Sequence, residues 1–147
     1  MKQGGIYDQI GFGFHRYSTD QKWLVPHFEK MLYDQAILIM AYVEAWQATG
    51  KEKYRQVVNE IITYIARDMT APEGGFYSAE DADSEGDEGT YYLWDPNEFK
   101  RHLTDSELTL FKSTFSPGKE GDFEGKTILH YNAKEMDFGF LGSENPN

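Results

Sequence analysis

Charged and aromatic side chains crowd residues 26–34, which read PHFEKMLYD. Imidazole transfers protons near neutral pH, and carboxylates serve as general bases or nucleophiles. If this stretch begins a helix, His27, Lys30 and Asp34 share one face of it, and Glu29 lies on the neighbouring face. Helix N-termini also favour anionic groups. We therefore expect a polar cleft here, with His27, Glu29 and Asp34 as catalytic acid/base candidates.

The same residues also allow a purely structural interpretation. Glu29 could pair with Lys30 or Arg16, and Asp34 has the same choice of partners. His27 could cap the helix. Ion-pair networks gather titratable groups just as active sites do, so both interpretations stay open on the sequence.

A second polar stretch, residues 14–18, reads FHRYS. His15 is a further catalytic acid/base candidate. Arg16 can hold a carboxylate or another oxygen at two points, which makes it a substrate-binding candidate. Tyr17 and Trp23 are candidates for stacking on a ligand ring.

An acidic loop occupies residues 80–88, EDADSEGDE. Its first two members, Glu80 and Asp81, are candidates for paired carboxylates of the kind that cleave glycosidic bonds. Tyr77, just before the loop, is a candidate substrate-binding residue. The acids partly imitate a calcium loop, but Tyr92 stands where such a loop needs a bidentate Glu. We expect a solvated charge run, no metal site and no cofactor.

Two predicted helices frame these stretches, one over 27–49 and one over 51–69. Pro26 predicts the first start, because proline at the first helical position needs no N–H partner, and Gly50 predicts its end. Residues 36–46, AILIMAYVEAW, predict a helix buried on most faces. The second helix carries a single apolar stripe at i, i+3, i+4 and i+7, which is typical of a surface helix. Together they predict an antiparallel hairpin with an inner and an outer member.

The remaining elements are predicted to be short. Strands are expected at Phe14–Tyr17 and Trp23–Val25, as a β-hairpin of Phe76–Ser78 with Thr90–Trp94, and at Thr127–Tyr131. Capping boxes predict two short helices, one after Asp95 with Glu98 and one near 105–115 with Thr104 and Glu107. The tail, about 139–147, has few apolar anchors and is expected to be flexible.

Composition excludes several functional classes. The formal net charge is −11, so we expect neither nucleic-acid binding, which needs a basic stripe, nor binding to an anionic membrane. The chain has no Cys, which excludes thiol catalysis within it and fits a cytoplasmic protein. No apolar run approaches the roughly 20 residues of a membrane helix, and the N-terminus lacks a signal-peptide core.

The inner and outer helices predict a mainly α architecture, in which one ring of buried helices lies inside a ring of surface helices. That arrangement is an (α/α)6 barrel, or toroid, with one or two short β-hairpins. The chain supplies too few hairpins to close the ring, so residues 1–147 are expected to form a single partial barrel domain. The exposed apolar surface would be covered by missing segments of a parent protein or by a second copy in a homo-oligomer.

Three motifs, GGIYDQIGFGFHRYSTDQKWLVPHFEKMLYDQA, GGFYSAEDADSEGDEGTYYLW and FEGKTILH, resemble the spermatogenesis-associated protein 20 family over roughly Gly4 to Tyr131. The resemblance implies a larger protein with a thioredoxin-like domain, followed by an (α/α)6 barrel similar to N-acylglucosamine 2-epimerases and six-hairpin glycosidases. This chain corresponds to part of that barrel and lacks the thioredoxin-like Cys motif. Phe12 departs from the family pattern, which has Gly at this position.

Two functional hypotheses follow. The parent barrel could act on a sugar-like small molecule through acid/base residues at its mouth, although the fragment alone would be inactive. Alternatively, the domain could be a non-catalytic scaffold that binds a protein or supports the thioredoxin-like domain. The sequence contains no complete catalytic signature that would decide between them.

Overall fold

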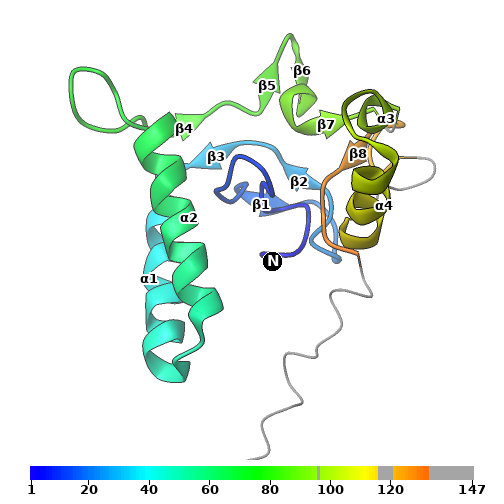
Figure 1. Ribbon diagram of the computed structural model, residues 1–147. Helices are drawn as coiled ribbons and strands as arrows, with labels where there is room; N and C mark the ends of the chain where they lie inside the picture. The colour runs from blue at the N-terminus through cyan, green and yellow to red at the C-terminus, as the bar shows by residue number, and fades with distance from the viewer. Residues whose placement is uncertain (96, 116–120, 133–147) are drawn as a thin grey trace, which may run out of the picture.

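The computed structural model describes residues 1–95, 97–115 and 121–132. These residues are mainly helical, with short antiparallel strand pairs. The N-terminal segment lies between a long helical hairpin, α1 and α2, and two short helices, α3 and α4 (Figure 1). The predicted flexible tail at 139–147 falls outside the described residues. Among the described residues, none of the helices combines the length and the apolar character that crossing a bilayer requires.

The predicted helical hairpin is confirmed. Helix α1 spans Leu32–Thr49 and α2 spans Glu52–Asp68. Gly50 ends α1 in the left-handed conformation with φ 65°, and its N–H donates to Trp46 O. Glycine adopts this conformation without a Cβ clash, so the chain can reverse within two residues.

Helix α2 packs on one face, as its apolar stripe predicts. Its buried residues are Val57, Val58, Ile61 and Tyr64. Val57 and Ile61 join Ile6, Tyr7 and Phe14 of the N-terminal segment in a core cluster. Burying a side chain of this size contributes about 1.5–3 kcal/mol, so this cluster fixes the N-terminal segment against the hairpin.

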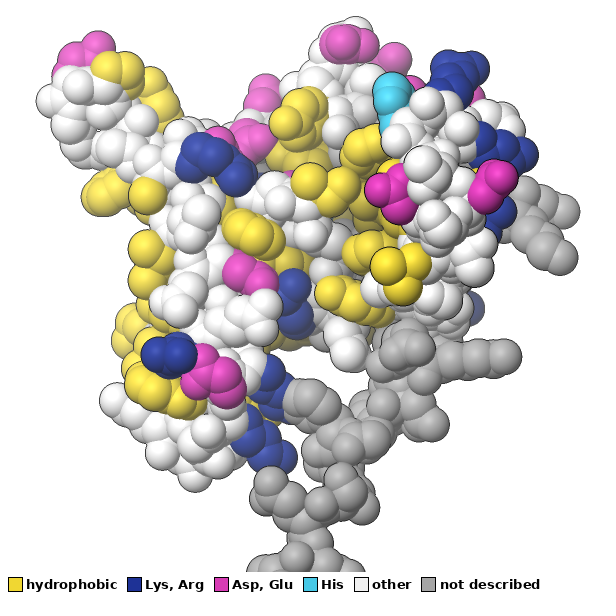
Figure 2. Space-filling model, viewed as in Figure 1, with side chains coloured by type: hydrophobic (Ala, Val, Ile, Leu, Met, Phe, Trp, Pro, Cys, Tyr) yellow, Lys and Arg dark blue, Asp and Glu magenta, His cyan; other side chains and the backbone are white. Residues whose placement is uncertain are grey.

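The prediction that residues 36–46 are buried on most faces is wrong for this chain. Only Gln35 is buried in α1, whereas Ile37 and Met40 are 62% and 64% exposed. Helix α1 packs on α2 and on the N-terminal segment, and that covers only part of its circumference. Hydrophobic side chains consequently remain visible along the outer edge of the hairpin (Figure 2).

The predicted start of the first helix is also wrong. Residues 26–31 are extended and form β2 (Pro26–His27) and β3 (Lys30–Met31). Strand β2 pairs with β1 (Tyr17–Ser18), and β3 pairs with β4 (Ala79–Glu80), both antiparallel. Pairing with two distant segments outweighs the local helix signal of Pro26. As a result, His27 and Lys30 do not share a helix face with Asp34.

The predicted β-hairpin of residues 76–78 with 90–94 is not formed. The hairpin lies inside the acidic loop instead, where β5 (Asp83–Ser84) pairs with β6 (Asp87–Glu88). Glu85 and Gly86 link them with φ 57° and 94°. Positive φ at both central residues is the pattern of a type I′ hairpin turn, so local turn chemistry decided the strand pairing.

The last described segments pack as a small unit. A short 3-10 helix, η1 (Thr90–Tyr92), leads into β7 (Leu93–Trp94), which pairs with β8 (Thr127–Ile128) inside the predicted strand 127–131. Helices α3 (Glu98–His102) and α4 (Asp105–Thr114) confirm the two predicted short helices. The capping box of α4 is present, because Glu107 N donates to Thr104 Oγ1 and Thr104 N donates to Glu107 Oε2.

Gly13 provides a test of the contact between the N-terminal segment and α2. Its φ is 81°, and an added Cβ would lie 2.7 Å from Tyr64 Cδ1. Gly13→Ala is expected to lower the free energy of unfolding by about 2–4 kcal/mol, from the left-handed backbone and the overpacking together. Urea denaturation measures this change in the free energy of unfolding.

Gly50→Ala is the matched control, because Gly50 also has a positive φ but no atom within 4 Å of an added Cβ. Gly50→Ala should lower the free energy of unfolding only by the backbone contribution, about 1–2 kcal/mol. Equal losses for the two variants would contradict the packing described here.

Candidate functional site

A buried lysine lies at the centre of the described structure. Lys30 is only 1% exposed, and its Nζ donates to Asp8 Oδ2 and to Phe12 O, each at 2.9 Å. Its ammonium also lies 4.5 Å from the ring centroid of Tyr64 and 4.7 Å from that of Tyr92. The charge is therefore compensated by one carboxylate, one carbonyl and two aromatic faces.

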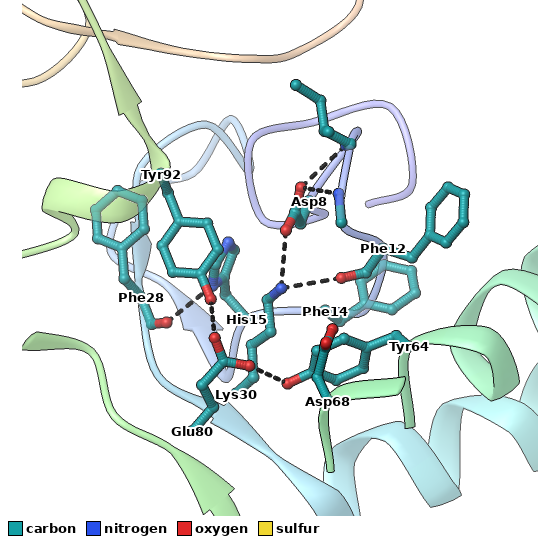
Figure 3. Close-up of polar contacts among 12 residues, drawn as sticks. Asp8, Phe12, Phe14, His15, Phe28, Lys30, Tyr64, Asp68, Glu80 and Tyr92 are labelled. Atoms are coloured by element: carbon teal, nitrogen blue, oxygen red, sulfur yellow. Dashed lines mark hydrogen bonds and ion pairs between the residues drawn. The ribbon is translucent and has the colours of Figure 1, made fainter. Parts of the chain in front are cut away.

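Glu80 completes this arrangement from the opposite strand. The register of β3 and β4 places Glu80 directly across from Lys30. Its Oε2 accepts the hydroxyl of Tyr64 and its Oε1 that of Tyr92, both at 2.6 Å (Figure 3). Burial, followed by these bonds to Glu80, raises the pKa of both tyrosines. We call Asp8, Lys30, Tyr64, Glu80 and Tyr92 the Lys30 network.

Asp8 remains ionised inside the network. Burial by itself would raise the pKa of its carboxyl, but the charge and hydrogen bond of Lys30 outweigh burial. The N–H groups of Ile10 and Gly11 also donate to Asp8 Oδ1. The net result is a pKa below the usual value, which keeps the ion pair intact at neutral pH.

Phe12 adopts a backbone conformation that glycine favours. Its φ is 69°, in the left-handed region that glycine favours. The residue is held there because its carbonyl accepts from Lys30 and its ring packs on the core cluster. These two contacts hold the turn in this conformation.

Five of the ten candidate residues line a single cleft of about 600 Å³. They are His15, Arg16, Tyr17, Trp23 and Asp34. Tyr17 and Trp23 are 50% and 43% exposed, so their rings are accessible from solvent. We call this the Arg16 cleft.

Asp34 is the unusual group of the Arg16 cleft. Its Oδ2 is shielded from solvent and accepts no hydrogen bond from any described residue. Burial raises its pKa, Arg16 opposes that effect, and Glu29 adds to it. A shielded carboxylate oxygen without a donor is costly, and in native proteins such atoms usually have a partner.

Glu29 and His27 lie beside this cleft and connect it to the acidic hairpin. Arg16 Nη1 donates to Glu29 Oε2 at 2.9 Å, and His27 Nε2 lies 3.6 Å from the same oxygen. The other ring nitrogen of His27 contacts Glu88 Oε1 at 2.7 Å, and its ring stacks on Tyr17. Part of the structural interpretation is therefore realised, because Glu29 pairs with Arg16.

His15 is a poor acid/base group in this environment. The side chain is 3% exposed, and burial, followed by the charge of Lys30, lowers its pKa to about 3. The ring is thus neutral at physiological pH. Its Nδ1–H donates to Phe28 O at 3.0 Å, because a carbonyl can only accept. Nε2 is left as an acceptor.

The remaining candidates lie elsewhere. Tyr77 and Glu80 line a second cleft of about 690 Å³ beside Lys30, and the two oxygens of Glu80 are each engaged by a tyrosine. Asp81 is exposed and accepts from Asp83 N, so it does not form a catalytic pair with Glu80 in a shared site. The ten candidates do not converge on one pocket. Searched over the described residues alone, the structure shows no group of three or more His, Asp or Glu that could hold a metal ion.

Sequence reasoning missed most of the Lys30 network. The sequence pattern does not mark Asp8, Tyr64 or Tyr92 as members of a site. It marks Lys30 only as part of a polar helix face and as a possible ion-pair partner. Their sequence separations, such as 22 residues for Lys30 and Asp8, leave no periodic signal. Only the Gly-rich turn after Asp8 hinted at a close backbone approach.

Lys30→Met tests whether the network holds the structure together. It leaves Asp8 as a buried, unpaired charge, so the free energy of unfolding is expected to fall by about 3–5 kcal/mol in urea denaturation. The double variant Asp8→Asn with Lys30→Met should recover part of that loss. The exposed Lys22→Met is the control and should change the value by less than about 0.5 kcal/mol. A Lys30→Met loss as small as that of Lys22→Met would refute the central role of Lys30.

Comparison with known proteins identifies relatives for most of the chain, although no family model matches it. Over 114 residues, 74% of this chain, it is 52% identical to spermatogenesis-associated protein 20 of Homo sapiens. It is 50% identical to the Mus musculus protein of the same name over 70% of the chain. An uncharacterised protein of Caenorhabditis elegans is 41% identical over 74% of it.

These alignments cover only 14–16% of the length of each relative, so the chain spans about a seventh of the proteins that it matches. Identity of this level over more than a hundred residues is far above chance similarity. The chain is homologous to spermatogenesis-associated protein 20 over about 70% of its length.

Proposed function

We propose that the chain is part of an (α/α)6 barrel domain in a larger protein and that the Arg16 cleft binds a sugar-like, polyhydroxylated ligand. The α1–α2 hairpin is the repeating unit that such a barrel requires. The much greater length of the relatives leaves room for further hairpins and for the thioredoxin-like domain that the resemblance implies. The proposed location is the cytoplasm.

The observation that carries this proposal is the unpaired Asp34 Oδ2. A ligand hydroxyl would donate to it and remove the cost of leaving a shielded carboxylate oxygen without a partner. Because burial raises the pKa of Asp34, this residue is also the best acid/base candidate of the cleft. The cleft volume of about 600 Å³ lies within the usual range of small-molecule sites.

The aromatic walls fit the flat faces of a sugar ring. Trp23 adopts φ 62°, a strained conformation for a bulky residue. Asp20 holds the loop in this shape, since its carboxylate accepts the N–H groups of Lys22, Leu24 and Val25. Strain that is held by neighbouring bonds commonly marks a functional position. Trp23 is thereby fixed on the cleft that Asp34 also lines, and Arg16 is held by Glu29.

Catalysis is assigned to the parent barrel and not to this chain alone, because a barrel site draws residues from several hairpins. Ile37 of α1 lines the Arg16 cleft and is also 62% exposed. A neighbouring helix that covered α1 would thus also close one side of the cleft.

An exposed stripe of α1 favours a second function, as a protein-contact surface. Tyr33, Ile37 and Met40 follow one another at i, i+4 and i+7, and they are 47%, 62% and 64% exposed. Helix faces of this kind are normally covered. We propose that another helix of the longer protein covers the stripe and that a second copy covers it in the isolated chain.

Ligand binding by the Arg16 cleft can be measured by saturation-transfer NMR with glucose and N-acetylglucosamine. Tetrahydropyran serves as a ring without hydroxyls. Asp34→Ala is expected to weaken sugar binding roughly ten-fold or more, the effect of losing a charged hydrogen bond. The same variant should leave the free energy of unfolding unchanged or raise it, because it removes an unpaired buried acceptor.

Asp87→Ala, which removes an exposed acid of β6, is the control and should not change binding. Equal signals for sugar and tetrahydropyran, or unchanged sugar binding by Asp34→Ala, would refute the proposed function.

Self-association follows from the exposed stripe. Light scattering of the isolated chain is expected to give a mass above that of the 17.0 kDa monomer. Met40→Lys should lower the measured mass to that of the monomer, because a charge in the contact is costly to bury. Ile62→Lys, at a 49% exposed position of α2, is the matched control and should leave the association intact. A monomeric wild-type chain would contradict the contact surface.

A further inference from the structure

A smaller cavity of about 300 Å³ adjoins the Lys30 network and is lined by two of its members, Asp8 and Tyr92. We call it the Gln9 cavity. Five aromatic side chains contribute to its wall, and Ile128 and Leu129 line it from β8 and the residue after it. The aromatic members are Tyr7, Phe28, Tyr91, Tyr92 and Trp94. Phe28 and Tyr92 are stacked nearly parallel, 5.8 Å apart, and present flat apolar surfaces.

The cavity contains an acceptor that lacks a donor. Gln9 Oε1 is shielded from solvent and accepts no hydrogen bond from the described residues. The orientation of the amide is fixed, because its other atom contacts Lys2 O at 2.9 Å and Gly4 O at 3.1 Å. Two carbonyl partners require a nitrogen at that position, so the unpaired atom is the oxygen.

His15 supplies a second acceptor on the same cavity. The side chain is 97% shielded and lines the cavity, and its Nδ1 is taken by Phe28 O. Because the ring is neutral with the proton on Nδ1, Nε2 carries a lone pair. Figure 3 shows this second nitrogen pointing away from Phe28 O, into the space between Tyr92 and the Asp8 loop. The hydrogen bond of the ring to the described residues is made by Nδ1, and Nε2 is not one of the fully shielded atoms without a partner.

We propose that the Gln9 cavity is a second binding site, for a small neutral aromatic ring that donates a hydrogen bond. An apolar cavity of about 150 Å³ accommodates benzene, so this volume is sufficient for a substituted ring. Two unpaired acceptors select a ligand that carries a donor. The carboxylate of Asp8, which also lines the cavity, disfavours an anion.

This site is independent of the proposed sugar cleft. The Arg16 cleft offers a carboxylate, a guanidinium and exposed rings, whereas the Gln9 cavity offers the stacked rings of Phe28 and Tyr92 and neutral acceptors. His15 lines both, but its free Nε2 is the atom that serves the cavity. Loss of phenol binding and loss of sugar binding can therefore be observed separately.

Phenol and anisole test the proposal on the 147-residue chain. The two rings have similar shapes, but only phenol donates a hydrogen bond. Phenol is expected to bind at millimolar concentration and roughly five-fold more tightly than anisole, as one net hydrogen bond would give. The ¹⁵N resonance of His15 Nε2 should move on addition of phenol and stay in place with anisole.

Two exposed aromatic residues provide the matched variants. Tyr91 lines the cavity and is 76% exposed, so Tyr91→Ala should remove a wall without disturbing the core and should weaken phenol binding several-fold. Phe76 is 61% exposed and lies outside the cavity wall, so Phe76→Ala should not change the affinity for phenol. Equal affinities for phenol and anisole, an unmoved His15 resonance, or equal effects of the two variants would overturn the proposal. Failure to bind phenol at millimolar concentration would also overturn it.

Discussion

The buried ammonium of Lys30 is the constraint on which the rest of the structure depends. A charge in a site only 1% exposed has to be compensated, and here Asp8 and Phe12 of the N-terminal segment do so together with the rings of Tyr64 and Tyr92. These partners come from three separate parts of the chain. The contacts of this one ammonium therefore join the N-terminal segment, α2 and η1 around β3. Glu80 connects β4 to the same group, because it accepts the hydroxyls of the two tyrosines.

Three hollows of the described residues adjoin one another near this centre. Tyr92 lines both the Gln9 cavity and the cleft beside Lys30, and His15 lines both the cavity and the Arg16 cleft. The positive charge of Lys30 also helps to keep His15 neutral. Together with burial, the network thus leaves His15 as a hydrogen-bond acceptor beside both proposed sites.

Chemistry that is local in the chain could be predicted from the sequence. The end of α1 at Gly50, the one-sided stripe of α2 and the capping box at Thr104 each depend on residues within a few positions of one another. The grouping of Arg16, Tyr17 and Trp23 also follows from their proximity in one loop. Contacts between distant segments could not be predicted. The sequence does not show that Lys30 lies across from Glu80, because strand register is decided by the packing of both partners.

By itself, the sequence determined the helical hairpin, the acidic and aromatic character of the chain, and five of the residues that line the Arg16 cleft. Tertiary structure alone decided that residues 26–31 are extended, that Glu80 is held by two tyrosines, and that α1 leaves Ile37 and Met40 exposed. The physical reason is that periodicity reports how apolar a helix is but not which neighbours are present to cover it. Likewise, a charged residue shows its chemistry in the sequence, whereas its burial and its partners are set only when distant segments meet.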